Sequence, residues 1–134
     1  MTKLTTSIIA VAVCVAFGVP VMAQTLPRDG YHAARKRVAA EYDMDKARCA
    51  RLEGNARAVC LADARGQAKV ARAEVEAQYH PSEQADRSLR VAKAEADYAV
   101  ARERCGTQKG DAKSACVTRA KAALKHGMAH AQNG

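Results

Sequence analysis

Apolar side chains recur along the chain with the period of an α-helix. In the first stretch, Tyr31, Val38, Tyr42 and Cys49 share one side of a helix with Asp45, at spacings of seven, four, three and four residues along the series 31, 38, 42, 45 and 49. A second stretch repeats spacings of three and four in Val91, Ala94, Tyr98, Ala101 and Cys105. These are the a/d spacings of a narrow helical seam. Strand-forming residues never alternate over a useful length. The pattern therefore predicts an all-α chain.

Breaks in this pattern mark the helix ends. The His80-Pro81-Ser82 segment ends one helix, because the residue before a proline disfavours α geometry. Ser82 can cap the next helix, with Glu83 in its first turn. These signals predict helices at about 29–53, 56–79, 83–107 and 112–127. The tail at 128–134 is expected to be disordered.

The seams belong to an internal repeat with a displacement of 56 residues. The two copies share the pattern Y-x6-C-x4-G-[ND]-A-[RK]-x2-C. The matched pairs include Tyr42 with Tyr98, Arg48 with Arg104, Ala64 with Ala120 and Lys69 with Lys125. Each copy spans two helices, so we expect two helical hairpins, at 24–81 and 82–127. They can form a four-helix up-down bundle or an elongated, coiled-coil-like array.

A Gly-Asn or Gly-Asp pair lies at the centre of each repeat. Gly54 and Gly110 are expected to end a helix, because glycine takes positive φ without a steric penalty. Asn55 and Asp111 are expected to cap the following helix through their side-chain oxygens. Each repeat is therefore predicted to be an αα-hairpin with a tight turn.

The cysteines straddle these glycines: Cys49 and Cys60 in the first repeat, Cys105 and Cys116 in the second. Positions at similar distances from a hairpin turn face each other, which makes a disulfide geometrically easy. Four cysteines allow three pairings, and the symmetry favours Cys49 with Cys60 and Cys105 with Cys116. Ten intervening residues do not match the two to four of metal-ligand pairs, so no metal and no cofactor is expected.

The N-terminus has the layout of a secretory signal peptide. Lys3 precedes an apolar run, and Val21-Met22-Ala23 forms a cleavage site before Gln24. Residues 1–23 are therefore expected to be removed, which predicts a periplasmic or secreted protein. A retained membrane anchor is the alternative, but the apolar run is interrupted by Gly18 and Pro20.

The composition indicates a small hydrophobic core and a positive net charge. From Gln24 onward the chain has no Trp, Phe or Ile and is rich in alanine. Loss of the leader, whose one charged residue is Lys3, lowers the net charge from +8 to +7. Basic strips are expected along two helices, at Arg57, Arg65, Lys69 and Arg72 and at Lys113, Arg119, Lys121 and Lys125. Small exported domains with thin cores commonly depend on disulfides.

The repeat motif, Gly54-Asn55-Ala56-Arg57 to Cys60 with a downstream Ala64-Arg65-Gly66, resembles that of a group of small exported proteobacterial proteins. Some of these proteins carry the label TolA-like because they share Ala/Lys/Glu-rich helices. The resemblance covers roughly residues 38–125 and implies an exported helical protein, with no activity to transfer. The second repeat departs from the motif, since Ala122 stands in the place of Gly66.

No catalytic constellation is evident, so we expect a non-enzymatic structural or binding protein of the periplasm or cell envelope. One alternative is a cationic adaptor or stress protein that binds anionic envelope components. Binding to a protein partner and self-association are also open, whereas a nucleic-acid partner is not expected. The other alternative is a thiol-redox or metal-buffering protein, in which His126 and His130, four residues apart, could bind a metal weakly. Counting free thiols separates this alternative from the other two.

Overall fold

The computed structural model describes residues 25–133, which form four helices and one short 3-10 turn. The expected signal peptide, with Cys14, lies outside these residues. The helices are α1 (Arg28–Cys49), α2 (Gly54–Tyr79), α3 (Glu83–Arg104) and α4 (Gly110–Asn133), with η1 (Cys105–Thr107) before α4. No strand occurs within the described part of the chain, so the predicted all-α class is confirmed.

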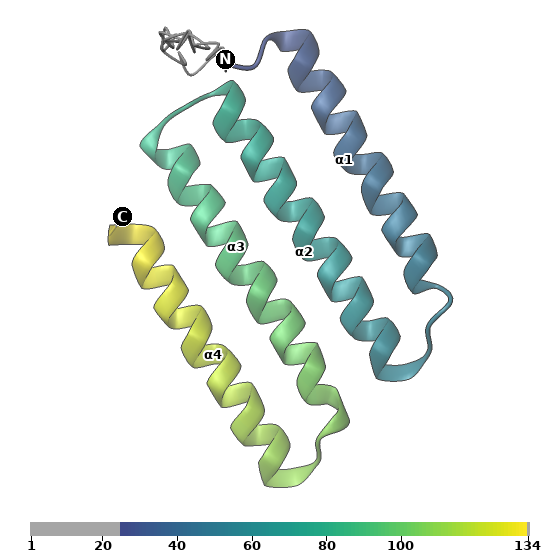
Figure 1. The fold of residues 1–134 in the computed structure, drawn as a ribbon. Coiled ribbons are helices and arrows are strands. Elements are labelled where there is room, and N and C mark those ends of the chain that lie inside the picture. The colour runs from purple at the N-terminus through teal and green to yellow at the C-terminus, as the bar shows by residue number, and fades with distance from the viewer. Residues whose placement is uncertain (1–24, 134) are drawn as a thin grey trace, which may run out of the picture.

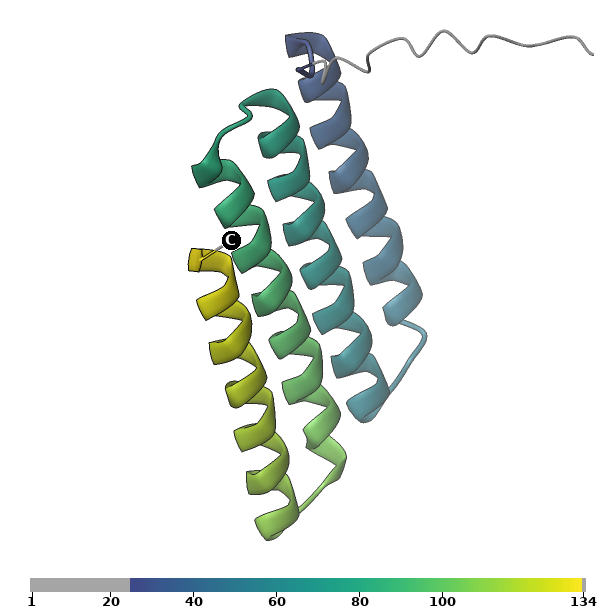
Figure 2. The same ribbon diagram turned by 60° about the vertical axis from the view of Figure 1, so that its left-hand side comes forward.

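The helices lie side by side in one layer, in chain order and alternating in direction (Figure 1). The view turned by 60° shows the same order, with α1 and α4 at opposite edges (Figure 2). Every extensive helix contact joins chain neighbours, and the contact between α2 and α3 is the largest. The predicted up-down arrangement is therefore present as an elongated array, and each broad face of the layer is open to solvent.

The first hairpin packs through the predicted seam. Val38 of α1 forms a buried cluster with Ala68 and Val75 of α2. Tyr31 stacks on Tyr79 with ring centroids 4.3 Å apart, beside this cluster. Such aromatic pairs add to the free energy gained by burying apolar area. The seam face of α1 is thus the face that holds α2.

The contacts of α3 with α2 and with α4 are both made through small side chains. At Gly66 of α2, a Cβ atom would lie 2.9 Å from the Cβ of Ala96 on α3. At Gly127 of α4, it would lie 2.9 Å from the Cβ of Ala94, on the other side of α3. Small residues let helix backbones approach closely and gain dispersion contacts. The alanine-rich composition therefore produces a layer held by close helix spacing.

The C-terminal tail differs from expectation. We predicted disorder over 128–134, but α4 continues to Asn133. Ala131 is fully buried, and the Arg90 guanidinium on α3 donates a hydrogen bond to its carbonyl oxygen at 3.2 Å. This contact satisfies a carbonyl at the end of α4 that would otherwise lack a helical partner. The prediction was wrong because the sequence pattern does not reveal this contact between helices.

Two predicted helix ends are also corrected. α1 ends at Cys49, and α3 ends at Arg104, both earlier than expected. Bonds of the 3-10 type follow each end, such as the Leu52 amide to the Cys49 carbonyl at 3.0 Å. Tightening of this kind is common in the last turn of a helix. The predicted cap at Ser82 is confirmed, since its hydroxyl accepts from the Ala85 amide at 3.1 Å.

Candidate functional site

Each hairpin is closed by a disulfide next to its turn. Cys49 is bonded to Cys60 with Cα atoms 5.5 Å apart, and Cys105 to Cys116 with Cα atoms 5.8 Å apart. This is the pairing that the symmetry about each glycine favours. Cys49 and Cys105 are almost completely buried. The bridges therefore lie within the helix packing at the end of the layer that carries both turns (Figure 1).

Gly54 and Gly110 adopt the predicted left-handed conformation, each with φ of 54°. Their position differs from the prediction, because each begins the second helix of its hairpin instead of ending the first. Residues 50–53 separate Gly54 from the end of α1. The helical hydrogen bonds of α2 start at the Glu53 carbonyl, which accepts from the Arg57 amide at 3.3 Å. The glycines therefore turn the chain into α2 and α4.

Asn55 does not cap α2 as predicted, since the helix starts without a side-chain cap. Its side-chain amide instead donates to the Glu103 carbonyl near the end of α3, at 2.7 Å. Its Oδ1 atom is buried and has no hydrogen-bond partner. Asp111, expected to cap α4, lies exposed in the first turn of that helix. Asn55 thus joins the two repeats, a contact that a carboxylate, which has no N–H group, cannot make.

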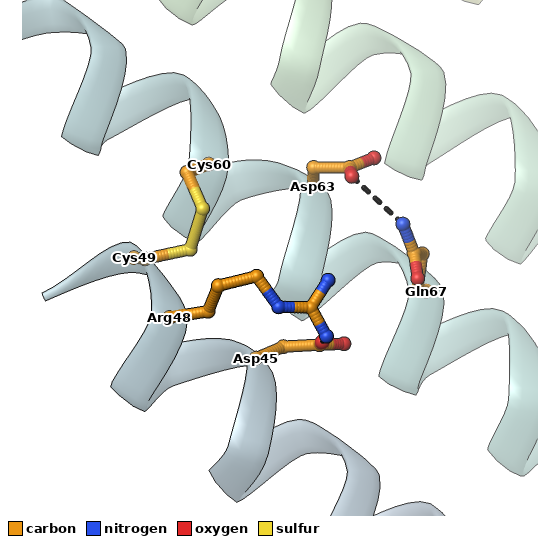
Figure 3. A network of polar contacts seen from close by, with 6 residues as sticks. All are labelled: Asp45, Arg48, Cys49, Cys60, Asp63 and Gln67. Atoms are coloured by element: carbon orange, nitrogen blue, oxygen red, sulfur yellow. Dashed lines mark hydrogen bonds and ion pairs between the residues drawn. A yellow bond between two sulfur atoms is a disulfide. The ribbon is translucent and has the colours of Figure 1, made fainter. Parts of the chain in front are cut away.

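Polar side chains surround the first disulfide (Figure 3). Arg48 pairs with Asp45 on α1 at 2.8 Å, and Gln67 donates to Asp63 on α2 at 2.7 Å. These partners are three or four residues apart on a single helix, the spacing that brings side chains together. Next to the bridge, the charges of Arg48 and Asp45 therefore compensate each other on α1, and the Asp63 carboxylate accepts a hydrogen bond from a neutral amide on α2.

Grooves run between α2 and α3 on the two broad faces of the layer. The first, of about 400 Å³, is lined in part by Arg65, Lys69, Glu95 and Arg102. The second, of about 410 Å³, is lined in part by Asp63, Glu74, Lys93 and Asp97. Gly66 and Ala96 form the floor that the two grooves share. The sequence pattern does not predict these grooves, because they result from the open layer.

The first groove belongs to a wider basic face. Arg65, Lys69 and Arg72 share one side of α2 at helical spacing. Glu76 continues that side and pairs with Arg35 of α1 at 3.6 Å. The repeat places Lys121 and Lys125 of α4 at the positions of Arg65 and Lys69. We define the basic face by the residues Arg35, Lys46, Arg65, Lys69, Arg72, Arg102, Lys121 and Lys125.

Neighbouring groups stabilise the protonated form of three cations on the basic face. A hydrogen bond with Tyr31 raises the pKa of Arg35. Hydrogen bonds with carboxylates do the same for two other cations, since Asp43 raises the pKa of Lys46 and Glu103 that of Arg102. These three cations therefore keep their charge throughout the neutral pH range.

The structure places the cations of the predicted basic strips on different faces of the layer. Arg65, Lys69 and Arg72 lie on the basic face, as do Lys121 and Lys125. Arg119 occupies the repeat position of Asp63, which lines the opposite groove. Arg35 and Arg102, which the sequence analysis missed, complete the face from α1 and α3. The available signal was that Arg35 lies eleven residues before Lys46 on α1 and that Lys46 is the repeat equivalent of Arg102, but the order of the helices was needed to use it.

The histidine pair is present without further ligands. The rings of His126 and His130 on α4 have centroids 4.6 Å apart. Among residues 25–133, no group of three or more His, Cys, Asp or Glu side chains is placed to hold a metal ion. None of the helices that the structure describes has the length and apolarity needed to cross a membrane.

Comparison of this chain with protein-family models, with curated protein sequences and with solved structures finds no match.

Proposed function

We propose that this chain is a non-enzymatic structural or binding protein of the bacterial periplasm or cell envelope. The observation that carries the proposal is the disulfide beside each turn of a thin helical layer. Structural disulfides persist in oxidising compartments, and the sequence begins with a signal-like leader. The layer offers wide solvent-facing surfaces, which suit binding more than chemistry.

The charged groups support a role without catalysis. Most ion pairs join side chains on one helix or on adjacent helices at the surface. Catalytic acids and bases commonly sit in clefts, where burial and neighbours shift their pKa values. The shifts in this chain concern exposed cations beside ordinary hydrogen-bond partners. We therefore assign the charges to solubility and surface binding.

A second, narrower candidate is favoured by the basic face. This surface extends over all four helices, and its acids include Glu76 and Glu95. A cationic surface attracts anionic lipid headgroups or polymers through long-range electrostatics. The chain would then act as an adaptor that lies with this face against an anionic envelope component.

The test is co-sedimentation with liposomes containing phosphatidylglycerol, compared with phosphatidylcholine alone. We expect binding to the anionic liposomes that weakens with added salt. The variant Arg65→Ala/Arg72→Ala should bind more weakly. Arg37 and Arg119 occupy the repeat positions of Lys93 and Asp63, which line the opposite groove. The matched control Arg37→Ala/Arg119→Ala therefore removes the same charge from the opposite face and should retain more binding. Equal losses in both variants would refute a specific basic face.

The thiol alternative has its own measurement. Protein taken directly from cells is alkylated without reductant, and its thiols are counted by mass spectrometry. Closed disulfides support the structural function. Free thiols at Cys49, Cys60, Cys105 and Cys116 would instead favour the thiol-redox or metal-buffering function.

A further inference from the structure

The two edges of the layer are related by the internal repeat. A displacement of 56 residues carries α1 onto α3 and α2 onto α4. The side of α2 that meets α3 therefore has an equivalent on the outer side of α4. The side of α3 that meets α2 likewise has an equivalent on the outer side of α1. Each unpartnered edge is thus a second copy of one half of the most extensive helix contact.

The residues at these edges are small and exposed. At the contact between α2 and α3, Gly66 meets Ala96. Their repeat equivalents are Ala122 on α4 and Ala40 on α1, and both are exposed. Alanines at seven-residue intervals extend each edge, with Ala33 and Ala47 on α1 and Ala115 and Ala129 on α4. Such a spacing keeps the alanines on one side of each helix.

We propose that a second copy of this chain docks its α1 against α4, repeating the arrangement of α2 and α3. This inference goes beyond the proposed function and does not depend on it. Contacts of this kind are heterologous, so they continue from copy to copy unless a ring closes. The result is a longer helical layer in which the basic face is repeated along its length.

The charged residues at the two edges support a second copy of this chain as the partner. Asp63 and Asp97 line the same groove between α2 and α3. Their equivalents across the proposed contact are Arg119 of one copy and Glu41 of the next, which have opposite charges. Asn55 similarly lies near Arg104, and the equivalent positions hold Asp111 and Arg48, another opposite pair. Complementary pairs favour this register over others.

Sequence differences between the two repeats make the proposed contact between copies weaker than the contact of α2 with α3. Ala122 adds a methyl group where Gly66 allows the closest approach, so the helices must lie farther apart. The two ion pairs between α2 and α3 also have no equivalents, because Ala39 takes the place of Glu95 in the pair with Lys69 and His130 takes the place of Glu74 in the pair with Lys93. We therefore expect assembly that depends on protein concentration.

Sedimentation velocity of the oxidised chain from Gln24 to Gly134 tests the proposal, because residues 25–133 contain all the contacts described. We expect the average mass to rise with concentration beyond that of a dimer. Ala40→Arg blocks one edge and Ala122→Arg the other, so each variant alone should remain monomeric. Their equimolar mixture should form a heterodimer and nothing larger, because one open edge remains on each partner. Circular dichroism confirms that each variant is folded.

Substitutions at the same two edges provide the controls, and two results would overturn the proposal. Ala40→Ser and Ala122→Ser keep a small side chain at the same exposed positions and should assemble like the parent. Ala122→Gly restores the repeat glycine and should shift assembly to several-fold lower concentration. A parent chain that is monomeric at every concentration overturns the proposal. Self-association of either arginine edge variant alone also overturns it, because that result means a two-fold contact between like edges.

Discussion

The disulfides are expected to supply a large part of the stability of this layer. Its buried apolar residues are mostly alanines, with Val38 and Val75 as the larger aliphatic side chains. Each bridge joins cysteines 11 residues apart in sequence. Closing a loop of this size restricts the unfolded chain and stabilises the folded state by about 3 kcal/mol. Small domains have total stabilities of only about 5–15 kcal/mol, so one bridge is a substantial fraction.

The perturbation is the double variant Cys49→Ala/Cys60→Ala, which removes the first bridge and leaves no unpaired thiol. Urea unfolding followed by far-UV circular dichroism should show a free energy of unfolding lower by about 3 kcal/mol. The matched variant Cys105→Ala/Cys116→Ala should lose a similar amount, because its loop has the same length. Non-reducing peptide mapping should show the remaining bridge intact in each variant.

Two results would refute this reasoning. A loss below about 0.5 kcal/mol in both variants, as for ordinary surface substitutions, would mean that helix packing alone holds the hairpins. A second test uses Cys49→Ala alone, which leaves Cys60 unpaired. If Cys60 then displaces a partner in the Cys105–Cys116 bond, the two repeats do not form their bridges independently.

Two further predictions concern the contact between the repeats. Gly66→Ala should lower the melting temperature, because a clash with Ala96 costing about 1–3 kcal/mol outweighs a helix-propensity gain of about 1 kcal/mol. A raised melting temperature would mean that α2 and α3 separate easily. Asn55→Ala should cost about 1 kcal/mol of unfolding free energy in urea, through loss of its bond to the Glu103 carbonyl. Asp111→Ala is the comparison, and an equal or larger loss there would contradict a role for Asn55 between the repeats.

The sequence predicts what depends on local chemistry and on the repeat. Glycines at 54 and 110 indicate the positive φ that the structure has, and Ser82 is recognisable as a cap. The seam through Val38 is visible because its members contrast in polarity with their neighbours. The cysteine pairing follows from the symmetry about each glycine. These features need no knowledge of how distant segments meet.

Features that depend on contact between helices are hidden. The side of α2 that meets α3 consists of small residues such as Ala62 and Gly66, which have too little hydropathy contrast to mark a packing face. The choice between bundle and array depends on that second face. The same limit applies to Arg90 and Asn55, whose polar side chains bind carbonyls on neighbouring helices.

Because each helix packs on its chain neighbour, most contacts in this protein join segments that are near in sequence. Chains of such low contact order fold rapidly. Oxidative folding is simplified in the same way, since the four cysteines in the described chain pair in order, the first with the second and the third with the fourth. In the export that we propose, Cys60 reaches the oxidising side while Cys49 is the nearest partner within the described chain. Among the described cysteines, the native bond is then also the first one within reach, so its formation does not require disulfide isomerisation.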